Sequence, residues 1–300
     1  MFKNSKILWR KASKIIPGGN GLLSKRPDRF LPDGWPTYFS KSKGVFIWDL
    51  NNKKYTDMSL MGIGTSVLGY NNSFINRFIK KKIDQGINTT LNCTEEFFLA
   101  RELLKIDKFA DQVKFARGGG EAMSLAVRLA RSKTKKSKIV FSGYHGWHDW
   151  YLAANLQDIS NLNNHLLKNL KPLGVPKILK NSAIPLEFNN LKELIKISKQ
   201  NEIAAIVVEP SRFKYLDKKF VSYLNKLCRS KKIILIIDEI TSGWRECLGG
   251  VYKKIGLRPD IVVYGKALGN GFAISALVGK KKVMDTAQDT FVSSVAWTEK

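Results

Sequence analysis

Four runs of mostly β-branched and aliphatic residues alternate along the chain with amphipathic stretches, and this alternation constrains the fold more than any other feature. The runs occupy residues 138–141, 203–208, 233–237 and 261–263. Runs of this kind are typical of strands buried on both faces of a sheet. The amphipathic stretches at residues 122–131, 191–199 and 220–231 are predicted helices, which implies right-handed crossovers between successive strands. The sequence therefore predicts an α/β domain with a mostly parallel sheet flanked by helices.

A smaller β element is expected before this domain. Residues 45–50 and 53–57 read as two short strands, and Asn51-Asn52 provides the turn between them. We therefore divide the sequence into an N-terminal segment with a β-hairpin, residues 1–70, and a large domain, residues 71–300.

The chain contains 51 Lys and Arg but only 25 Asp and Glu, which gives a formal net charge of +26. An excess of this size raises the question of a nucleic-acid or membrane partner. However, the lysine clusters at residues 80–82, 133–138 and 280–282 lack interleaved aromatic residues, so they read as solvated helix faces or turns. We therefore expect neither nucleic acid nor a membrane as a partner.

The sequence also lacks the marks of a membrane-bound or disulfide-linked protein. No stretch reaches the roughly 18 uncharged apolar residues that a membrane span needs, and the first residues lack a signal-peptide core, so a cytoplasmic location is expected. The three cysteines, Cys93, Cys228 and Cys247, are far apart and odd in number. This pattern favours reduced thiols over a disulfide framework.

Three consecutive glycines, Gly118, Gly119 and Gly120, lie just before the predicted helix that starts at Ala122. The N-terminus of a helix presents free backbone N–H groups, and glycine lets a ligand approach the backbone closely. The turn is therefore a candidate seat for an anion or a phosphate. Taken alone, a tight strand-to-helix turn without a ligand explains it equally well.

Ionisable side chains follow two of the predicted strands. Asp238 and Glu239 end the run at residues 233–237, where a buried carboxylate needs a cation or a hydrogen-bond donor. A protonated pyridine nitrogen would be such a partner, and Mg²⁺ is the alternative, although the chain has no GxxxxGK[ST] loop. Lys266 follows the run at residues 261–263, and a desolvated lysine can form a Schiff base. An ordinary surface lysine is the alternative there.

Residues 143–150, Gly-Tyr-His-Gly-Trp-His-Asp-Trp, concentrate aromatic side chains in a loop after a predicted strand. Such a loop suits stacking on a flat ring, and a hydrophobic plug is the alternative. His145 and His148, with Asp149 adjacent, would be compatible with a metal site. The sequence offers no convincing third ligand, so we predict no metal.

Taken together, these segments resemble the class III (fold type I) aminotransferases that depend on pyridoxal 5'-phosphate (PLP), and within them the glutamate-1-semialdehyde 2,1-aminomutase-like branch. The resemblance spans essentially the whole chain, from residues 17–19 to residues 297–299. The matching motifs occur in the family's order and are Gly-Gly-Glu-Ala at 119–122, Gly-Tyr-His-Gly at 143–146, Val-Glu-Pro at 208–210, Asp-Glu-Ile-Thr-Ser-Gly-Trp-Arg at 238–245 and Pro-Asp-Ile-Val-Val-Tyr-Gly-Lys at 259–266.

The resemblance implies a PLP site and a role for each matching residue. Lys266 would carry PLP as an internal aldimine and move protons, and Asp238 would pair with the pyridine nitrogen. The remaining cofactor-binding residues implied are Gly119 and Gly120 at the phosphate, Tyr144 stacked on the ring, Glu209 near the O3′ side of the ring, and Thr298, which would reach the phosphate of a neighbouring subunit. A site shared in this way implies a homodimer.

Two features depart from the family pattern. Arg117-Gly118 stands where the family commonly has a polar residue followed by Ser or Thr, so one side-chain contact to the phosphate would be missing. The chain ends at Lys300, whereas family members continue into a C-terminal small domain, so we expect a truncated sequence that lacks this domain.

Transamination between an amino donor and a carbonyl acceptor is the expected reaction. Two alternatives stay open: an aminomutase of the glutamate-1-semialdehyde type, and a non-catalytic PLP-fold protein with a binding or regulatory role. Lys25 and Arg26 could bind a substrate carboxylate, or could be solvated surface charge. Residues 147–150 and Trp297 could suit a sugar or another bulky carbonyl substrate.

Overall fold

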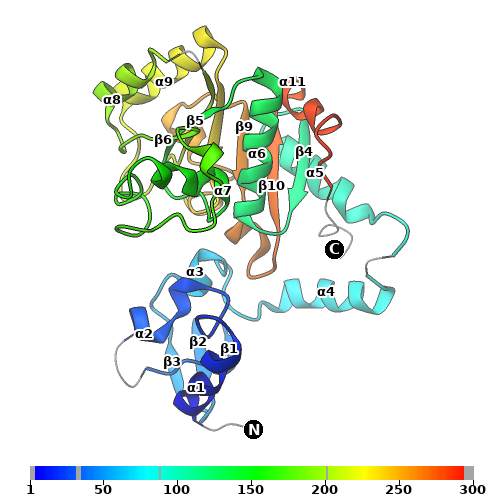
Figure 1. The fold of residues 1–300 in the computed structure, drawn as a ribbon. Coiled ribbons are helices and arrows are strands. Elements are labelled where there is room, and N and C mark those ends of the chain that lie inside the picture. Colours follow the sequence, from blue (N-terminus) through cyan, green and yellow to red (C-terminus); the bar gives the residue numbers. More distant parts are fainter. Residues whose placement is uncertain (1–3, 32–34, 88, 201, 294–300) are drawn as a thin grey trace. The chain divides into compact units, whose positions relative to one another are not determined.

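The computed structural model describes residues 4–31, 35–87, 89–200 and 202–293. It separates into two compact units, Met1–Gln85 and Gly86–Lys300, which are drawn in Figure 1. Helix α4 (Ser73–Gln85) belongs to the first unit, whereas the division made from the sequence placed its residues in the large domain.

The N-terminal unit is built around a small antiparallel sheet in the order β1-β2-β3. The two predicted strands correspond to β2 (Phe46–Asp49) and β3 (Lys54–Thr56), and Asn52 in the turn has φ 62°. Strand β1 (Phe39–Lys43) was not predicted because its sequence, Phe-Ser-Lys-Ser-Lys, is mostly polar and exposed. The helices of this unit are α1 (Ser5–Ile15), η1 (Leu23–Lys25), α2 (Pro27–Phe30), α3 (Met61–Gly64) and α4.

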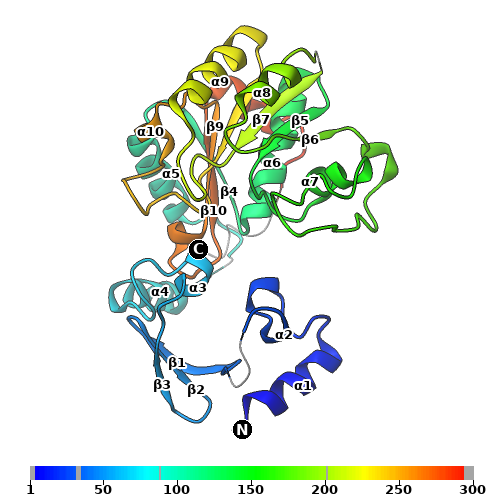
Figure 2. The same ribbon diagram turned by 90° about the vertical axis from the view of Figure 1, so that its left-hand side faces the viewer.

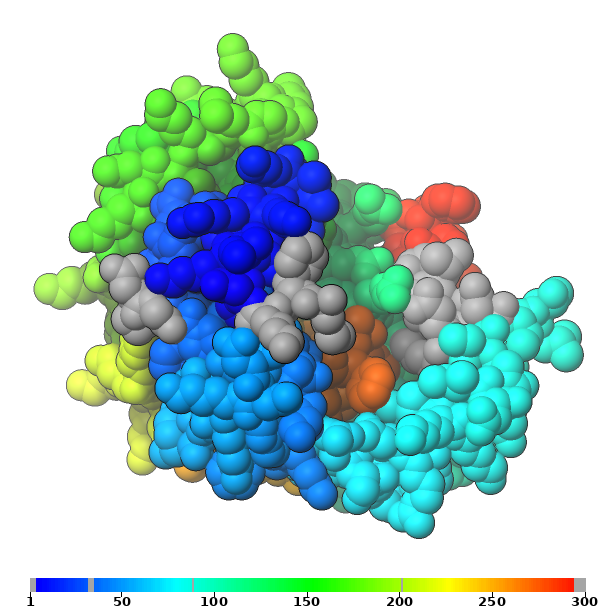
Figure 3. Space-filling model, turned by 90° about the horizontal axis from the view of Figure 1, so that it is seen from below, coloured from blue at the N-terminus to red at the C-terminus, as the bar shows by residue number. Residues whose placement is uncertain are grey.

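Large apolar side chains are exposed on this unit, which runs from blue to cyan in Figure 3. On α4, Phe74 and Phe78 pack edge to face at 4.9 Å between ring centroids, and both side chains are more than half exposed. Adjacent exposed aromatic rings are typical of surfaces that contact another polypeptide segment.

The second unit contains the predicted α/β sheet. Its described residues form seven strands in the order β4-β10-β9-β8-β7-β5-β6, in which β10 pairs antiparallel with both neighbours and the other pairs are parallel. The strands are β4 (Gln112–Ala116), β5 (Lys138–Ser142), β6 (Ala183–Pro185), β7 (Ile203–Val208), β8 (Ile234–Asp238), β9 (Ile261–Tyr264) and β10 (Ser275–Gly279). The predicted mostly parallel sheet is confirmed.

Helices cover both faces of this sheet. Figure 2 views it nearly edge-on, with α6 and α7 on one side and α5 and α10 on the other. The predicted helices correspond to α6 (Gly119–Thr134), α8 (Leu191–Ile197) and α9 (Lys218–Lys231). The other helical segments of the unit are α5 (Thr94–Ile106), α7 (Asp149–Leu152), η2 (Ala153–Leu156), η3 (Lys177–Leu179), α10 (Tyr252–Ile255), η4 (Lys266–Gly269), α11 (Lys281–Met284) and η5 (Asp285–Ala287).

Successive side chains of the central strands pack alternately into two hydrophobic cores, one on each face of the sheet. This alternation explains why the strands are continuously hydrophobic. In β8, Ile234 and Ile236 pack with α6, whereas Leu235 and Ile237 pack with residues of α9. A strand covered on both faces has no solvent-facing position for a polar side chain. Within the described ranges, no helix is long and apolar enough to cross a lipid bilayer.

Candidate active site

Three neighbouring parallel strands end in ionisable side chains at one edge of the sheet. Glu209 follows β7, Asp238 ends β8, and Lys266 follows β9 after Gly265. Since β7, β8 and β9 are adjacent and parallel, their carboxyl ends share an edge, which is where open α/β sheets bind ligands. Both carboxylates are buried, with Glu209 5% and Asp238 3% exposed.

The Asp238 carboxylate is held by a histidine from another loop. His145 Nδ1 lies 2.7 Å from Asp238 Oδ2, and the backbone N–H of Ile240 donates to Oδ1 at 3.0 Å. The imidazole is itself buried and stacks on Trp150, with 6.3 Å between ring centroids. A carboxylate has about four acceptor positions, so these two contacts leave capacity for a further donor.

Glu239, the neighbouring carboxylate, takes part in a different set of contacts. It is fully buried; Ser242 Oγ donates to its Oε2 at 2.5 Å, and the backbone N–H of Tyr252 donates to its Oε1 at 2.7 Å. Burial raises the pKa of Glu239 to about 7. The two adjacent acidic residues, Asp238 and Glu239, therefore have separate partners.

Glu209 is anchored where β5 and β7 end. Its Oε2 accepts a hydrogen bond from the backbone N–H of Tyr144 at 3.0 Å and lies 3.3 Å from Arg212 Nη1. Burial and the nearby charge of Asp238 raise the pKa of Glu209, and His145 and Arg212 oppose this shift. A buried acid with a raised pKa beside a second carboxylate is typical of functional sites.

The Lys266 amine lies in the same neighbourhood. Its Nζ donates to Thr241 Oγ1 at 2.7 Å. Burial lowers the pKa of Lys266, while the charges of Asp238 and Glu209 act in the opposite direction. The residue has φ 43°, a left-handed conformation that lysine rarely adopts. A partly desolvated amine that carries less charge is a better nucleophile than a surface lysine.

The glycine turn forms the start of helix α6. Gly118 is the N-cap, and the first N–H groups of any helix, here those of Gly119 and Gly120, have no partner within the helix. Ser275 Oγ donates to the carbonyls of Ala116 and Gly118 at 2.9 and 3.1 Å, which fixes the turn against β10. A helix N-terminus of this kind is suited to binding an anion, and the phosphate site at Gly119 and Gly120 stays a prediction.

The turn is also closely packed against the neighbouring loops. A Cβ on Gly119 would lie 2.7 Å from Ile240 Cδ1, and a Cβ on Gly120 would lie 3.0 Å from His148 Cε1. A Cβ at Gly119 would force a neighbouring group to shift and a Cβ at Gly120 would be tightly packed, whereas a Cβ on Gly118 would meet nothing within 4 Å.

Some aromatic side chains in and next to the loop at residues 143–150 are buried, and others are exposed. Trp150 and Tyr151 are buried, whereas Tyr144 is 39% exposed and its ring meets Tyr151 edge-on. Trp147 is 71% exposed and stacks on His148, with 4.6 Å between ring centroids. Tyr144 is therefore an exposed aromatic face that is tied through its backbone to Glu209.

Other residues named from the sequence are outside the described residues or belong to the N-terminal unit. Thr298 and Trp297 are outside the described residues. Arg26 belongs to the N-terminal unit, where its Nη2 pairs with Asp28 Oδ2 at 2.6 Å. In the described part of the chain, no three His, Cys, Asp or Glu side chains are grouped to hold a metal, and His145 faces Asp238.

The contact between His145 and Asp238 could not be derived from the sequence. The two residues are 93 positions apart, and only the fold brings the loop after β5 beside the end of β8. The available signal was the position of His145 in a loop at a strand end, next to a tyrosine.

A model of a known protein family matches most of the chain. The model for class III aminotransferases matches residues 33–293, which include every site residue described above. The chain belongs to the class III aminotransferase family.

Relatives within the family carry different names. A glutamate-1-semialdehyde 2,1-aminomutase of Nitrosopumilus maritimus is 36% identical over 292 residues, which cover 94% of this chain and 65% of that protein. A 3-aminobutyryl-CoA aminotransferase of Cloacimonas acidaminovorans is 30% identical over 300 residues, covering 97% of this chain and 68% of that protein. The chain therefore spans about two thirds of the length of these class III aminotransferases.

Solved structures share the fold. The PLP internal aldimine form of the FumI protein of Sphingopyxis sp. MTA144 superposes with a TM-score of 0.86 at 26% identity, over 99% of this chain and 69% of that one. A glutamate-1-semialdehyde aminomutase of Pseudomonas aeruginosa PAO1 superposes with a TM-score of 0.78 at 20% identity, over 97% of this chain and 63% of that one. The fold is thus that of the class III aminotransferases.

Proposed function

We propose that this chain holds PLP on Lys266 and that the protein transfers an amino group from a donor to a carbonyl acceptor. The observation that carries the proposal is the meeting of a desolvated amine, a buried carboxylate and a glycine-lined helix N-terminus at one edge of the sheet. Amine, acid and anion seat are the three groups that PLP requires of a protein.

The described residues fit the cofactor. Gly119 and Gly120 would hold the phosphate through their backbone N–H groups, since a helix N-terminus favours negative charge. The backbone contacts would replace the side-chain contact missing at Arg117-Gly118. Tyr144 would cover one face of the ring with its exposed aromatic surface, and Glu209 would lie near the O3′ side.

Asp238 would pair with the pyridine nitrogen. When bound, PLP supplies an aldehyde that reacts with amines and a ring that accepts electron density from the substrate. His145 fixes the Asp238 carboxylate at 2.7 Å, so Asp238 can hold its charge toward the ring nitrogen without reorienting.

Lys266 would act as the base once its amine is free. Burial lowers the pKa of the Nζ group, which raises the fraction of neutral amine available to accept a proton. Thr241 Oγ1, 2.7 Å away, would hold the amine in place between proton transfers. Negative charge on Asp238 and Glu209 opposes this lowering of the Lys266 pKa.

An aminomutase is the second candidate, and the 36% identity to a protein of that name favours it. An aminomutase uses the same lysine and the same acid but returns the amino group to the same carbon skeleton. Assaying the full-length protein with glutamate 1-semialdehyde, in parallel with separate donor and acceptor pairs, distinguishes the two reactions. Turnover in neither assay by protein with PLP bound would favour a non-catalytic role.

The cofactor assignment is tested with Lys266→Ala. We expect the full-length protein with added PLP to show an absorbance band that borohydride fixes on Lys266, and we expect the variant to lose both the band and the modified peptide. Lys196→Ala, at an exposed position on α8, is the matched control and should behave like the unchanged protein. A band that is retained in Lys266→Ala and fixed on another lysine contradicts the proposal.

We also propose a homodimer with small-molecule substrates. The support is the implied role of Thr298 at a neighbouring subunit's phosphate and the exposed rings of Phe74 and Phe78. Sedimentation of the PLP-loaded protein at the mass of a single subunit, at micromolar concentration, contradicts it.

A further inference from the structure

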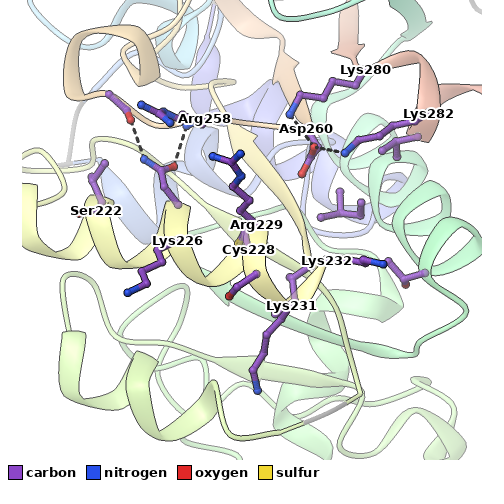
Figure 4. Close-up of a pocket in the computed structure, with 18 of the residues that line it drawn as sticks. Ser222, Lys226, Cys228, Arg229, Lys231, Lys232, Arg258, Asp260, Lys280 and Lys282 are labelled. Carbon is purple, nitrogen blue, oxygen red and sulfur yellow. Dashed lines mark hydrogen bonds and ion pairs between the residues drawn. The ribbon is translucent and has the colours of Figure 1, made fainter.

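A large cavity lies at the edge of the sheet opposite the candidate active site. Its volume is about 1720 Å³, and it is lined by residues that precede β8 and β9, by α9 and by the segment after β10 (Figure 4). Strand β8 begins at Ile234, which lines the cavity, and ends at Asp238, in the active site. The two sites are therefore separated by the length of the central strands, and nothing in the proposed transamination uses the cavity.

Half of the residues that line the cavity are basic. The lining contains twelve Lys and Arg residues and a single carboxylate, Asp260. That carboxylate is already paired, since Lys280 Nζ lies 2.9 Å and Lys282 Nζ 3.6 Å from its Oδ1. Two further lysines of the lining are paired with carboxylates outside it, Lys253 with Asp107 at 2.8 Å and Lys254 with Glu246 at 3.5 Å. The other cations still give the cavity a net positive charge, and a concave surface lined by positive charges attracts anions. The twelve are Lys133, Lys136, Lys218, Lys226, Arg229, Lys231, Lys232, Lys253, Lys254, Arg258, Lys280 and Lys282.

Two guanidinium groups are available to a ligand. Among the described residues, the side chains of Arg229 and Arg258 form no hydrogen bond or ion pair, and Figure 4 shows both at the cavity. Arg258 is fixed through its backbone, because its N–H donates to Asn225 Oδ1 at 2.9 Å, and Asn225 Nδ2 in turn donates to the carbonyl of Gly256 at 2.9 Å. The loop before β9 is in this way attached to α9.

The chemistry of the lining indicates the class of ligand. Arginine binds phosphate oxygens with two parallel hydrogen bonds, and lysine adds point charges around them. The lining includes no aromatic residue on which a base could stack, which disfavours single-stranded nucleic acid. We propose that this cavity binds a small polyanion with a run of several phosphate groups, either an inorganic polyphosphate or the phosphate chain of a nucleotide.

The proposal is tested by calorimetric titration of the full-length protein saturated with PLP, using tripolyphosphate and ATP as separate probes. Saturation with PLP keeps the phosphate seat at Gly119 and Gly120 from competing. We expect both probes to bind and the double variant Arg229→Gln with Arg258→Gln to weaken binding by about tenfold or more, since each removes a charged hydrogen-bond donor. Arg10→Gln with Arg29→Gln makes the same charge change in the N-terminal unit and should leave the affinity unchanged.

The results distinguish an inorganic polyphosphate from a nucleotide, and both of these from nucleic acid. Equal affinity for the two probes identifies the phosphate run alone as the ligand, whereas a tighter complex with ATP identifies a nucleotide. Absence of binding, or equal loss in the control variant, overturns the proposal. Tighter binding of a thymidine oligonucleotide than of tripolyphosphate, lost in the double variant, overturns it in favour of nucleic acid. The PLP absorbance spectrum should be the same in all variants, which verifies that they fold.

Discussion

The position of the Asp238 carboxylate depends on His145. Both side chains are buried, and the distance of 2.7 Å between Nδ1 and Oδ2 makes this the main side-chain contact of the carboxylate. Because a hydrogen bond to a charged group stabilises by about 1.5–3 kcal/mol, its loss would leave Asp238 poorly compensated and free to rotate. His145 is therefore a positioning residue for the proposed partner of the cofactor nitrogen.

Replacing His145 should weaken the cofactor site without unfolding the protein. We expect His145→Phe to raise the dissociation constant of PLP by roughly ten- to a hundredfold and to change the absorbance band, because Asp238 loses its donor. His145→Gln retains an amide donor and should recover part of the affinity. A spectroscopic titration of both variants would contradict this role if they bound PLP equally well and with unchanged spectra.

The turn between β4 and α6 would contact the phosphate through its backbone and not through its side chains. Gly119 has no room for a Cβ, because the stiff side chain of Ile240 lies against it at 2.7 Å from the Cβ position, and Gly118 has open space around it. Gly118 also has φ −107° and ψ 147°, which any residue adopts. The two glycines are therefore a matched pair for experiment.

Gly119→Ala should displace Ile240 or the turn. Overpacking of this kind costs roughly 1–3 kcal/mol, so we expect a lower melting temperature and about tenfold weaker PLP binding. Gly118→Ala should leave both quantities unchanged. Thermal melts and PLP titrations of the two variants provide the check, and equal effects at both positions would mean that the packing at Gly119 is not what matters.

Elements buried on both faces could be predicted from the sequence, and others could not. The apolar runs identified β5, β7, β8 and β9 to within one residue at each end, because a short, continuously hydrophobic run is typical of a strand covered on both faces. Strand β10 was missed since its sequence, Ser-Ala-Leu-Val-Gly, is short, and nothing local indicates an antiparallel strand between β4 and β9. Strand β6, Ala-Ile-Pro, is too short to leave a pattern.

Some residues of the candidate site could likewise be predicted from the sequence, and others could not. Asp238 and Lys266 could be placed together because the ends of adjacent parallel strands share an edge, whereas Glu209 was expected at the site only from the family resemblance. The partners that modify them, His145 and Thr241, needed tertiary contacts. The basic cavity was hidden for a related reason: its lysines and arginines run from Lys133 to Lys282 in the sequence and read there as solvated surface.

At the scale of the whole molecule, stability should depend on one buried histidine. His165 is 5% exposed, and its Nδ1 accepts a hydrogen bond from the backbone N–H of Gly143 at 3.2 Å, which requires the neutral ring. Burial lowers the pKa of His165 to about 4, and the charges of His145 and Arg212 contribute to the shift. In the unfolded chain a histidine titrates near pH 6.5, so between these values the unfolded state binds more protons.

The free energy of unfolding should therefore fall as the pH drops from about 6.5 to 4, by roughly 3 kcal/mol from this residue alone. The contribution is fully present above pH 6.5 and is lost as the folded-state pKa is reached. His165→Gln keeps an acceptor for Gly143 but does not titrate, so it should lose less stability over this range. Urea unfolding of both proteins at several pH values measures the difference, and identical pH profiles would refute the assignment.

The antiparallel strand β10 has a consequence for how the cofactor site is made. Among the described strands β4, which leads into the glycine turn, pairs only with β10 and so joins the sheet through Ser275–Gly279, although α6 after the turn packs on β8. During synthesis β5, β7, β8 and β9 can pair as they leave the ribosome, whereas β4, made earlier, must wait for β10. We expect β4, which leads into the proposed phosphate site, to stay unpaired until β10 emerges, so competence to bind the proposed cofactor should arise late in translation.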